Sequence, residues 1–211
     1  MTAKKETRVR PADDPEALAE AIVLLRAGQV VAFPTDTVYG IGAHAFIDGA
    51  VARLYAVKQR PPDKFIPLLL SDAGDLPQVC DAVPASAWKL ARRFWPGALT
   101  LVVPKGAGIP PIVSAGPGVA VRVPAHSVVP ELIARLGVPL AATSANLSGG
   151  HSPVTAQEVL AQLGGRIPLI LDGGLCPGGV PSTVYDLTVD PPQVQREGDI
   201  SREALEACLR A

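Results

Sequence analysis

The sequence predicts a single α/β domain in which helices cover a mixed β-sheet. Strand-like apolar runs and helix-like segments alternate over the whole length of the chain. With 211 residues and 48% apolar side chains, the chain is large enough to fill one core. Its 22 prolines and 20 glycines are scattered among loops, so no linker is long enough to separate two domains.

Local signals mark the start of the domain. Asp14 can cap a helix N-terminus, and the proline after it suits a first helical turn. An apolar stripe continues from there, and Gly28 is expected to end the helix. Residues 1–13 are then interpreted as an N-terminal extension, and residues 14–211 as the domain itself.

The elements that follow are expected from the same kinds of pattern. Residues 30–34 form an apolar strand, and a second helix begins at Asp48 as its cap and ends at Lys58, before a pair of prolines. Further strands are expected at 66–70, 98–104, 119–124, 138–144, 167–174 and 181–188, and further helices at 72–80, 85–94, 131–137, 155–163 and 201–210.

Composition narrows the class of protein. The formal net charge is −1, whereas proteins that grip a long duplex usually carry a basic excess. No secretory signal and no membrane-spanning run is expected. The three cysteines and three histidines show no disulfide framework and no zinc-ligand spacing. These features predict a cytoplasmic protein with reduced thiols and no protein-bound zinc.

Polar loops follow several of the expected strands. The strand at 30–34 is followed by TDT, the strand at 138–144 runs into TSANLSG, and the strand at 181–188 is preceded by GGVPS. Ligands of open α/β sheets often bind where such loops meet. Taken singly, each loop is also explained as an ordinary turn, because Ser, Thr, Asn and Gly are the usual turn residues.

Several cations could serve an anionic ligand. Lys58, Arg60 and Lys64 lie just beyond a helix end, where solvated basic residues that offset the helix dipole are the simpler interpretation. Arg122 lies within an alternating apolar strand, and a half-buried arginine needs an anionic partner. Arg196 on its own is best explained as an exposed charge at a strand end.

The motifs in combination resemble one family. PTDTVYGIG, KQRPPDK, VAVRVP, TSANLSG, PSTVYDL and REG occur in the order seen in YrdC-type L-threonylcarbamoyladenylate synthases. The pairing of Lys58 and Arg60 with Ser144 and Asn146 is specific to that family, and the resemblance covers roughly residues 14 to 200. It implies a YrdC-like catalytic domain in its short, single-domain form, with a twisted mixed sheet around a central cationic cavity.

The resemblance also implies an activity. The family uses ATP, L-threonine and bicarbonate or CO₂ to make threonylcarbamoyl-AMP and pyrophosphate. Other enzymes then transfer the threonylcarbamoyl group to adenosine 37 of tRNAs that read ANN codons. Mg²⁺ would arrive with ATP and be held mainly by the phosphates, without a metal site of the protein. Weak tRNA binding is compatible with this activity, and no membrane is involved.

Site residues follow from the resemblance alone. It implies catalytic roles for Lys58, Arg60, Ser144 and Asn146; threonine contacts for Thr37, Arg122, Ser144 and Ser182; and nucleotide contacts for Lys58, Arg60, Lys64, Gly118, Asn146 and Arg196. Gly40 and Gly42 would let the backbone turn close to the ligand, and Tyr39 is expected in the core.

Two departures and three rival interpretations stay open. Some relatives carry a histidine near Leu69 and a threonine at Val154. The rivals are an RNA-binding or ribosome-maturation module of the same fold, a carbamoyl-adenylate activity as in hydrogenase-maturation carbamoyltransferases, and a non-catalytic homologue. The net charge and the 4% aromatic content disfavour the first, and the absence of the extra segments of those longer chains disfavours the second. The intact Lys58, Arg60, Ser144 and Asn146 disfavour the third.

Overall fold

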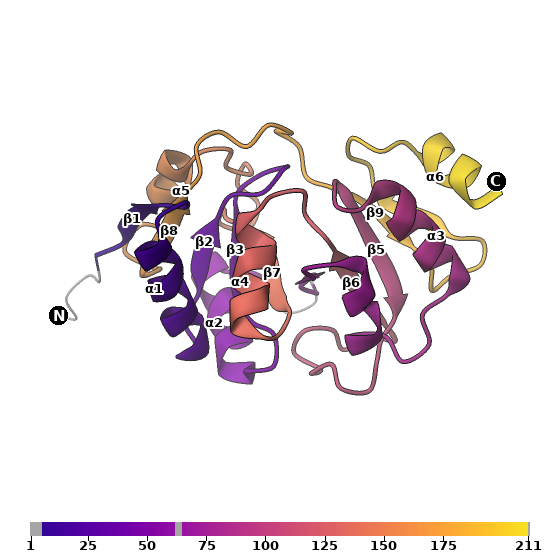
Figure 1. The fold of residues 1–211 in the computed structure, drawn as a ribbon, viewed down its shortest axis with the longest axis horizontal. Helices are drawn as coiled ribbons and strands as arrows, with labels where there is room; N and C mark the ends of the chain where they lie inside the picture. The colour runs from indigo at the N-terminus through magenta and orange to yellow at the C-terminus, as the bar shows by residue number, and fades with distance from the viewer. Residues whose placement is uncertain (1–5, 62–64, 211) are drawn as a thin grey trace.

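A mixed sheet runs through the whole computed structural model, which describes residues 6–61 and 65–210 (Figure 1). Within those residues the sheet has ten strands in the order β1-β8-β2-β3-β7-β4-β6-β5-β9-β10. The strands are β1 (Arg8–Pro11), β2 (Val31–Phe33), β3 (Gly40–His44), β4 (Leu68–Leu69), β5 (Leu99–Pro104), β6 (Gly118–Arg122), β7 (Leu140–Ser144), β8 (Leu169–Asp172), β9 (Thr183–Asp186) and β10 (Gln193–Arg196). The chain therefore forms the single α/β domain that its alternating pattern predicts.

Helices pack on both faces of this sheet. They are α1 (Pro15–Arg26), α2 (Asp48–Lys58), the 3-10 helix η1 (Ala73–Gln78), α3 (Ala85–Phe94), α4 (Val128–Leu136), α5 (Ala156–Leu163) and α6 (Arg202–Arg210). Apolar residues of α1 and α4 form one buried cluster with one set of strand side chains, and those of α2, α3 and α5 form a second cluster with the alternate set. Apolar side chains on both faces of the central strands are therefore buried, which explains why those strands form nearly continuous apolar runs in the sequence.

The centre of the sheet reverses direction several times. β3 is antiparallel to both β2 and β7, and β7 is antiparallel to β4, whereas β4 and β6 run parallel. The loop after β2 and the end of β7 therefore lie at one edge of the sheet, because Gly40 pairs with Ser144. Arg122, at the end of β6, reaches that loop through hydrogen bonds to Asp36 and Thr37, and the Gly178 and Gly179 amides donate to the same loop. The polar loops singled out in the sequence thus converge.

The local signals at helix ends are largely confirmed. Asp14 caps α1 by accepting from the Glu16 amide, and Gly28 follows the helix with φ of 71°. Asp48 is instead the first residue of α2, and Ile47 is the residue before it, without a side-chain cap. Arg8–Pro11, assigned to an N-terminal extension, form β1 and pair in parallel with β8 at the sheet edge.

The prediction that the backbone turns at Gly40 and Gly42 is wrong. Both lie in β3, and neither has a positive φ. A Cβ added at either position would come within 2.8 Å of the Phe33 ring, on the neighbouring strand β2. The glycines are therefore explained by close packing under an aromatic ring.

The Gly/Pro-rich segment between β5 and β6 is anchored to the body of the protein. Val113 is fully buried, and its carbonyl accepts from the Ile66 amide. The Ser114 hydroxyl donates to the Gly118 carbonyl, and the Tyr55 hydroxyl donates to the Ile112 carbonyl. This segment is a packed loop in the present conformation.

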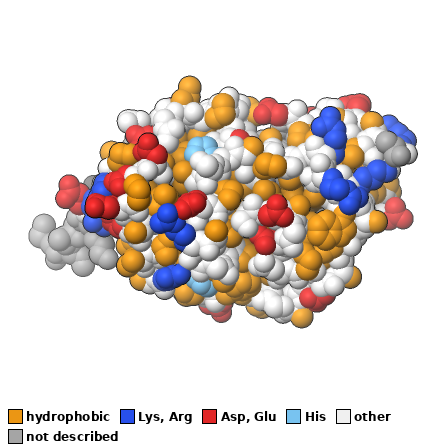
Figure 2. All heavy atoms as spheres, viewed as in Figure 1, with side chains coloured by type: hydrophobic (Ala, Val, Ile, Leu, Met, Phe, Trp, Pro, Cys, Tyr) orange, Lys and Arg blue, Asp and Glu red, His pale blue; other side chains and the backbone are white. Residues whose placement is uncertain are grey.

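Charges of both signs are distributed over the surface. Figure 2 shows basic side chains gathered at the end of the molecule where α3 and α6 lie, with acidic side chains scattered over the rest of that face. No helix in the described part of the chain is both long and apolar enough to cross a membrane.

Candidate active site

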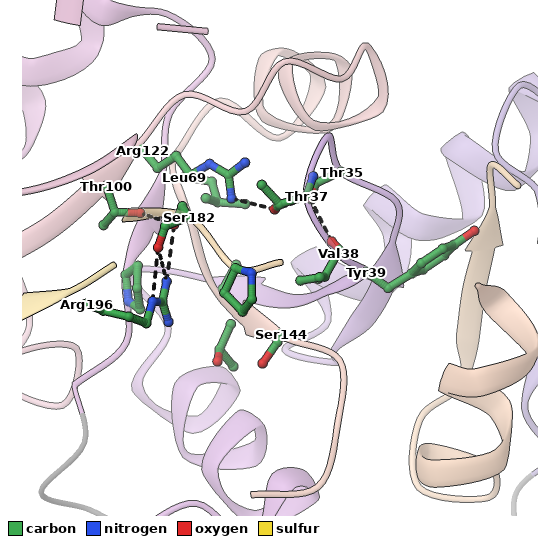
Figure 3. A pocket seen from close by; sticks show the side chains of 15 residues that line it. Thr35, Thr37, Val38, Tyr39, Leu69, Thr100, Arg122, Ser144, Ser182 and Arg196 are labelled. Atoms are coloured by element: carbon green, nitrogen blue, oxygen red, sulfur yellow. Dashed lines mark hydrogen bonds between the residues drawn. The ribbon is translucent and has the colours of Figure 1, made fainter. Parts of the chain in front are cut away.

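A small cavity lies where the polar loops converge (Figure 3). Its volume is about 100 Å³. The side chains that matter most for its chemistry are Thr37, Leu69, Arg122, Ser144, Ser182 and Arg196. They come from the loop after β2 and from β4, β6, β7, the start of β9 and β10, so six separate segments build the cavity.

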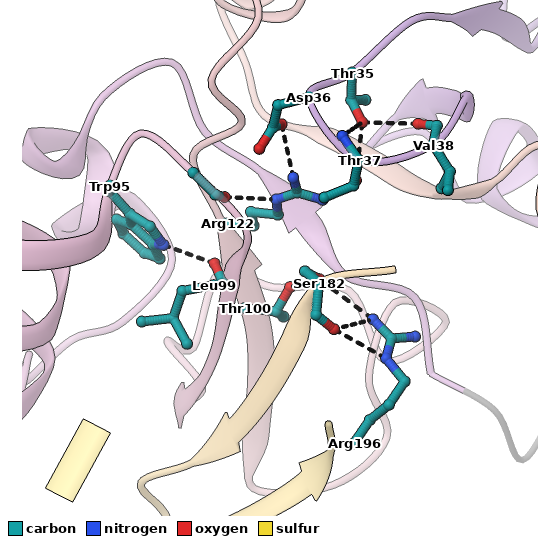
Figure 4. Close-up of polar contacts among 11 residues, drawn as sticks. Thr35, Asp36, Thr37, Val38, Trp95, Leu99, Thr100, Arg122, Ser182 and Arg196 are labelled. Carbon is teal, nitrogen blue, oxygen red and sulfur yellow. Dashed lines mark hydrogen bonds and ion pairs between the residues drawn. The ribbon is translucent and has the colours of Figure 1, made fainter. Parts of the chain in front are cut away.

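Arg122 is held at all three of its guanidinium nitrogens. Its Nε donates to the Gly97 carbonyl at 2.9 Å, its Nη1 to the Thr37 hydroxyl at 2.9 Å, and its Nη2 to the Asp36 carboxylate at 2.7 Å (Figure 4). A guanidinium carries five N–H groups, so two remain without a partner among the described residues. Asp36 is thus the anionic partner that a buried arginine requires.

Burial and the Asp36 carboxylate act oppositely on Arg122. Removal from water lowers the pKa of the Arg122 guanidinium from its ordinary value, and the adjacent carboxylate raises it. An arginine remains charged in proteins even so. Arg122 is therefore a fixed cation whose free N–H groups can meet a planar anion.

A chain of hydroxyls fixes where the hydrogen of Thr37 points. The Thr35 hydroxyl donates to the Val38 carbonyl at 2.7 Å, because a carbonyl can only accept. In the 3.0 Å contact between the two hydroxyls, Thr37 must then be the donor to Thr35. Thr37 also accepts from Arg122, so it can offer a ligand only a lone pair.

The Ser144 hydroxyl, like that of Thr37, can only accept a hydrogen bond from a ligand. Its hydroxyl donates to the Asn146 side-chain oxygen at 2.5 Å. The Asn146 amide nitrogen donates to the carbonyls of Leu147 and Gly150, which fixes the orientation of that side chain. Ser144 and Thr37 therefore face the cavity as acceptors, whereas Arg122 faces it as a donor.

Arg196 and Ser182 form the other wall. Arg196 donates to the Ser182 carbonyl from Nε at 3.0 Å and from Nη2 at 2.7 Å, and the Ser182 hydroxyl lies 2.7 Å from that of Thr100. Desolvation of the guanidinium against this strand end, and then the charges of Arg122 and Arg60, lower the pKa of Arg196. Three arginines thus act on one region, which favours the arrival of an anion.

Lys58 is the last residue of α2, as expected, but its side chain is not solvated. The residue is only 1% exposed. Its ammonium donates to the carbonyls of Ser144 and Asn146, the latter at 2.7 Å. Burial, and secondarily the charge of Arg60, lower the pKa of Lys58 to about 7. In this conformation Lys58 holds the backbone from Ser144 to Asn146 in place through these two hydrogen bonds.

The structure brings together only part of the predicted set. Thr37, Arg122, Ser144, Ser182 and Arg196 line the cavity. Lys58, Arg60, Asn146 and Gly118 do not line it, and Lys64 lies outside the described residues. Arg60 donates to the Phe65 carbonyl at 2.6 Å, and a Cβ at Gly118 would lie 2.9 Å from the Val102 side chain, which explains that glycine by packing.

Sequence reasoning missed three residues of the site. Thr35 and Asp36 directly precede Thr37 in the TDT loop, and Thr100 lies in β5 beside Ser182. Two neighbouring polar residues around a candidate threonine were a usable signal for the first two. Tyr39 is fully buried, as expected, and its ring points away from the cavity (Figure 3).

The departure at Leu69 gives the cavity an apolar side. Leu69 is 6% exposed and lines the cavity together with Val38 and Ala142. A ligand in this cavity would meet hydrogen-bonding groups on one side and aliphatic carbon on the other. Among residues 6–61 and 65–210, no group of three or more His, Cys, Asp or Glu side chains is arranged to hold a metal ion.

Fold and cavity together define an α/β protein with a binding site for a small, polar, anionic ligand. A family model for Sua5, YciO and YrdC proteins, with the description "Telomere recombination", matches residues 23–198. The chain therefore belongs to the Sua5/YciO/YrdC family.

Relatives of two lengths resemble the chain. It is 45% identical to a threonylcarbamoyl-AMP synthase of Bacillus subtilis over 93% of this chain and 57% of that protein. It is 39% identical to one from Vibrio vulnificus over 86% of this chain and 98% of that protein. The chain thus spans little more than half of the longer relative and nearly all of the shorter one.

Two solved structures have a fold similar to that of this chain. A P. abyssi Sua5 complexed with L-threonine matches with a TM-score of 0.90 and 40% identity, over 97% of this chain and 60% of that chain. E. coli YciO matches with a TM-score of 0.84 and 27% identity, over 95% of this chain and 99% of that chain. The fold expected from the sequence is confirmed.

Proposed function

We propose that this protein is an L-threonylcarbamoyladenylate synthase, which converts ATP, L-threonine and bicarbonate or CO₂ into threonylcarbamoyl-AMP and pyrophosphate. The observation that carries the proposal is the polarity of the cavity, in which Arg122 donates while Thr37 and Ser144 accept. The relatives named threonylcarbamoyl-AMP synthase and the similarity to a threonine-bound structure support it.

L-threonine suits this polarity. Its carboxylate would take the two remaining N–H groups of Arg122, since a forked donor matches a planar anion. Its nitrogen and its hydroxyl are donors, and they would meet the acceptor hydroxyls of Thr37 and Ser144. Its methyl group would lie against the apolar side of the cavity, which includes Leu69. Ser182 completes the polar wall.

The chemistry needs no nucleophile from the protein. The threonine nitrogen attacks the carbon of CO₂ and loses a proton, which gives a carbamate. A carbamate oxygen then attacks the α-phosphorus of ATP, the bond between that phosphorus and its bridging oxygen breaks, and pyrophosphate leaves. Positioning and charge neutralisation carry such a step. Arg196 and Arg60 are the cations suited to the phosphates, and Mg²⁺ would enter as part of MgATP.

The product would be used elsewhere. Threonylcarbamoyl-AMP is a reactive mixed anhydride, and we propose that partner enzymes transfer its threonylcarbamoyl group to adenosine 37 of tRNAs that read ANN codons. The reaction would then take place in the cytoplasm. With a net charge of −1, any tRNA binding by this chain itself is expected to be weak.

Pyrophosphate release tests the proposal. Pyrophosphate is measured in reactions that contain ATP and bicarbonate with or without L-threonine, and L-serine and L-alanine serve as controls. The mass of the nucleotide product is determined by mass spectrometry. We expect threonine-dependent release and the mass of threonylcarbamoyl-AMP. Folded protein that shows no threonine dependence would contradict the proposal, and salt-sensitive tRNA binding without ATP would then support the RNA-binding alternative.

A further inference from the structure

We propose that Asp36 is a positioning residue for the substrate carboxylate, because it holds Arg122 in the one orientation that presents free N–H groups to the cavity. The proposal rests on the proposed function, since it takes the carboxylate to be that of L-threonine. Asp36 itself would not touch the substrate.

The geometry gives Asp36 a specific part in the clamp on Arg122. Each guanidinium nitrogen has its own acceptor, and the three acceptors come from different groups: the Gly97 carbonyl, the Thr37 hydroxyl and the Asp36 carboxylate. Two of these acceptors are neutral, and Asp36 is the charged one. The guanidinium assists all three bonds with its charge, and the bond to Asp36, in which both groups are charged, is the shortest at 2.7 Å.

Asp36 is itself held from the opposite side. Its backbone carbonyl accepts from the Gly178 amide at 3.0 Å, and the Thr37 carbonyl accepts from the Gly179 amide at 2.9 Å. The two backbones are so close that a Cβ at Gly178 would lie 2.8 Å from the Asp36 carbonyl oxygen. The Asp36 side chain is only 14% exposed. Asp36 does not line the cavity itself, and it is a mostly buried carboxylate held in place behind Arg122.

The carboxylate also balances charge before substrate arrives. Arg122 and Arg196 are close enough for the first to lower the pKa of the second. The Asp36 carboxylate offsets this repulsion at Arg122. The buried guanidinium therefore keeps its position beside the cavity when no substrate anion is bound. Asp36 would thus act on the substrate indirectly, by fixing the orientation of the Arg122 guanidinium.

Kinetics of two Asp36 variants test the proposal. Asp36→Ala removes the acceptor, and Asp36→Asn keeps an oxygen for Nη2. We expect Asp36→Ala to raise the KM for threonine about tenfold, the size of one lost charged hydrogen bond, with kcat and the KM for ATP changed less than about threefold. Asp36→Asn keeps the acceptor but loses the charge, so its KM for threonine should lie between those of wild type and Asp36→Ala. Asp81→Asn is the matched control, because Asp81 accepts a backbone N–H in a loop outside the cavity lining.

A binding comparison separates a positioning role from a structural one. L-threonine and L-threoninamide, which lacks the carboxylate, are titrated calorimetrically into wild type and Asp36→Ala. We expect the variant to lose affinity for threonine only. Should Asp36→Ala not fold, Asp36→Ser serves in its place, since its short hydroxyl does not reach Nη2.

Three results would overturn the proposal while the proposed function stands. These are equal losses for threonine and threoninamide, an equal rise in the KM for ATP, or an Asp36→Asn variant as impaired as Asp36→Ala. Wild-type protein that neither binds threonine nor releases pyrophosphate with it would overturn the proposed function, and this proposal with it. The wild-type arm therefore distinguishes the two failures.

Discussion

The ammonium nitrogen of Lys58 lies 2.7 Å from the backbone carbonyl oxygen of Asn146. It also donates to the Ser144 carbonyl and, at 3.5 Å, to the Asn146 side-chain oxygen. These acceptors match the three N–H groups of an ammonium. Lys58 thereby ties the C-terminal end of α2 to the loop that presents the Ser144 hydroxyl. Its contact with the phosphates of ATP stays a prediction.

Arg122→Lys should impair threonine binding although it keeps the charge. A lysine has no planar fork, so it cannot satisfy Gly97, Thr37 and Asp36 and also meet a carboxylate. We expect the KM for threonine to rise roughly thirtyfold, from about 2 kcal/mol of lost charged hydrogen bonding, with little change in the KM for ATP. Steady-state kinetics with each substrate varied in turn measure this.

Arg196→Lys is the companion variant for that experiment. Arg196 lies on the opposite wall, so its loss should raise the KM for ATP more than the KM for threonine. If both variants impaired the two substrates in parallel, the assignment of the carboxylate to Arg122 would be wrong.

Thr35→Val should change the polarity of Thr37. The valine leaves the Val38 carbonyl and the Thr37 amide without their hydroxyl partner, and it frees the Thr37 hydrogen to point elsewhere. We expect a loss of about 1–3 kcal/mol in the free energy of unfolding and a raised KM for threonine. Thr35→Ser keeps the hydroxyl and should stay near wild type. Urea titration and kinetics together measure both effects, and equal behaviour of the two variants would argue against the hydroxyl chain.

Gly178→Ala should disturb the cavity from outside. The new methyl group would meet the Asp36 carbonyl at 2.8 Å and the Thr37 Cα at 3.1 Å, and both are backbone atoms that cannot turn aside. We expect about 1–3 kcal/mol of destabilisation together with a weaker affinity for threonine. Gly108→Ala is the control, because nothing lies within 4 Å of a Cβ there and its φ is not positive. A fully active and stable Gly178→Ala variant would show that the segment moves away without cost.

The sequence predicted well where the cause of a structure is local. The cap at Asp14, the end of α4 at Gly137 and the extent of α3 depend on residues within a turn or two, and each is found as expected or within a few residues. Apolar runs in the sequence also identified β5, β6 and β7, although β4 shortened to Leu68–Leu69 because only these two residues pair with the strands on either side.

The errors have distant causes. Gly40 and Gly42 looked like hinges because their reason, the Phe33 ring, lies on the neighbouring strand. The residues whose carbonyls accept from Lys58 lie 86 and 88 positions along the sequence from it, and Asp36, the anionic partner of Arg122, lies 86 positions from that arginine. A single sequence shows that a cation is present but does not show which carbonyl or carboxylate it contacts, so the contacts of these side chains could not be predicted.

Lys58→Met should remove a pH dependence of stability. Burial lowers the pKa of Lys58 from 10.5 to about 7, so between those values the unfolded chain holds a proton that the folded chain has released. Stability must then rise with pH across this window, and the stabilising contribution disappears as pH falls to about 7. We expect the free energy of unfolding of wild type, minus that of Lys58→Met, to increase by up to about 1.4 kcal/mol per pH unit between pH 7 and 10. Urea titrations of both proteins at intervals of one pH unit measure the difference, in which the other titrating groups cancel. Parallel curves would mean that the carbonyls of Ser144 and Asn146 keep the ammonium charged in the folded protein and that its pKa stays near the ordinary value.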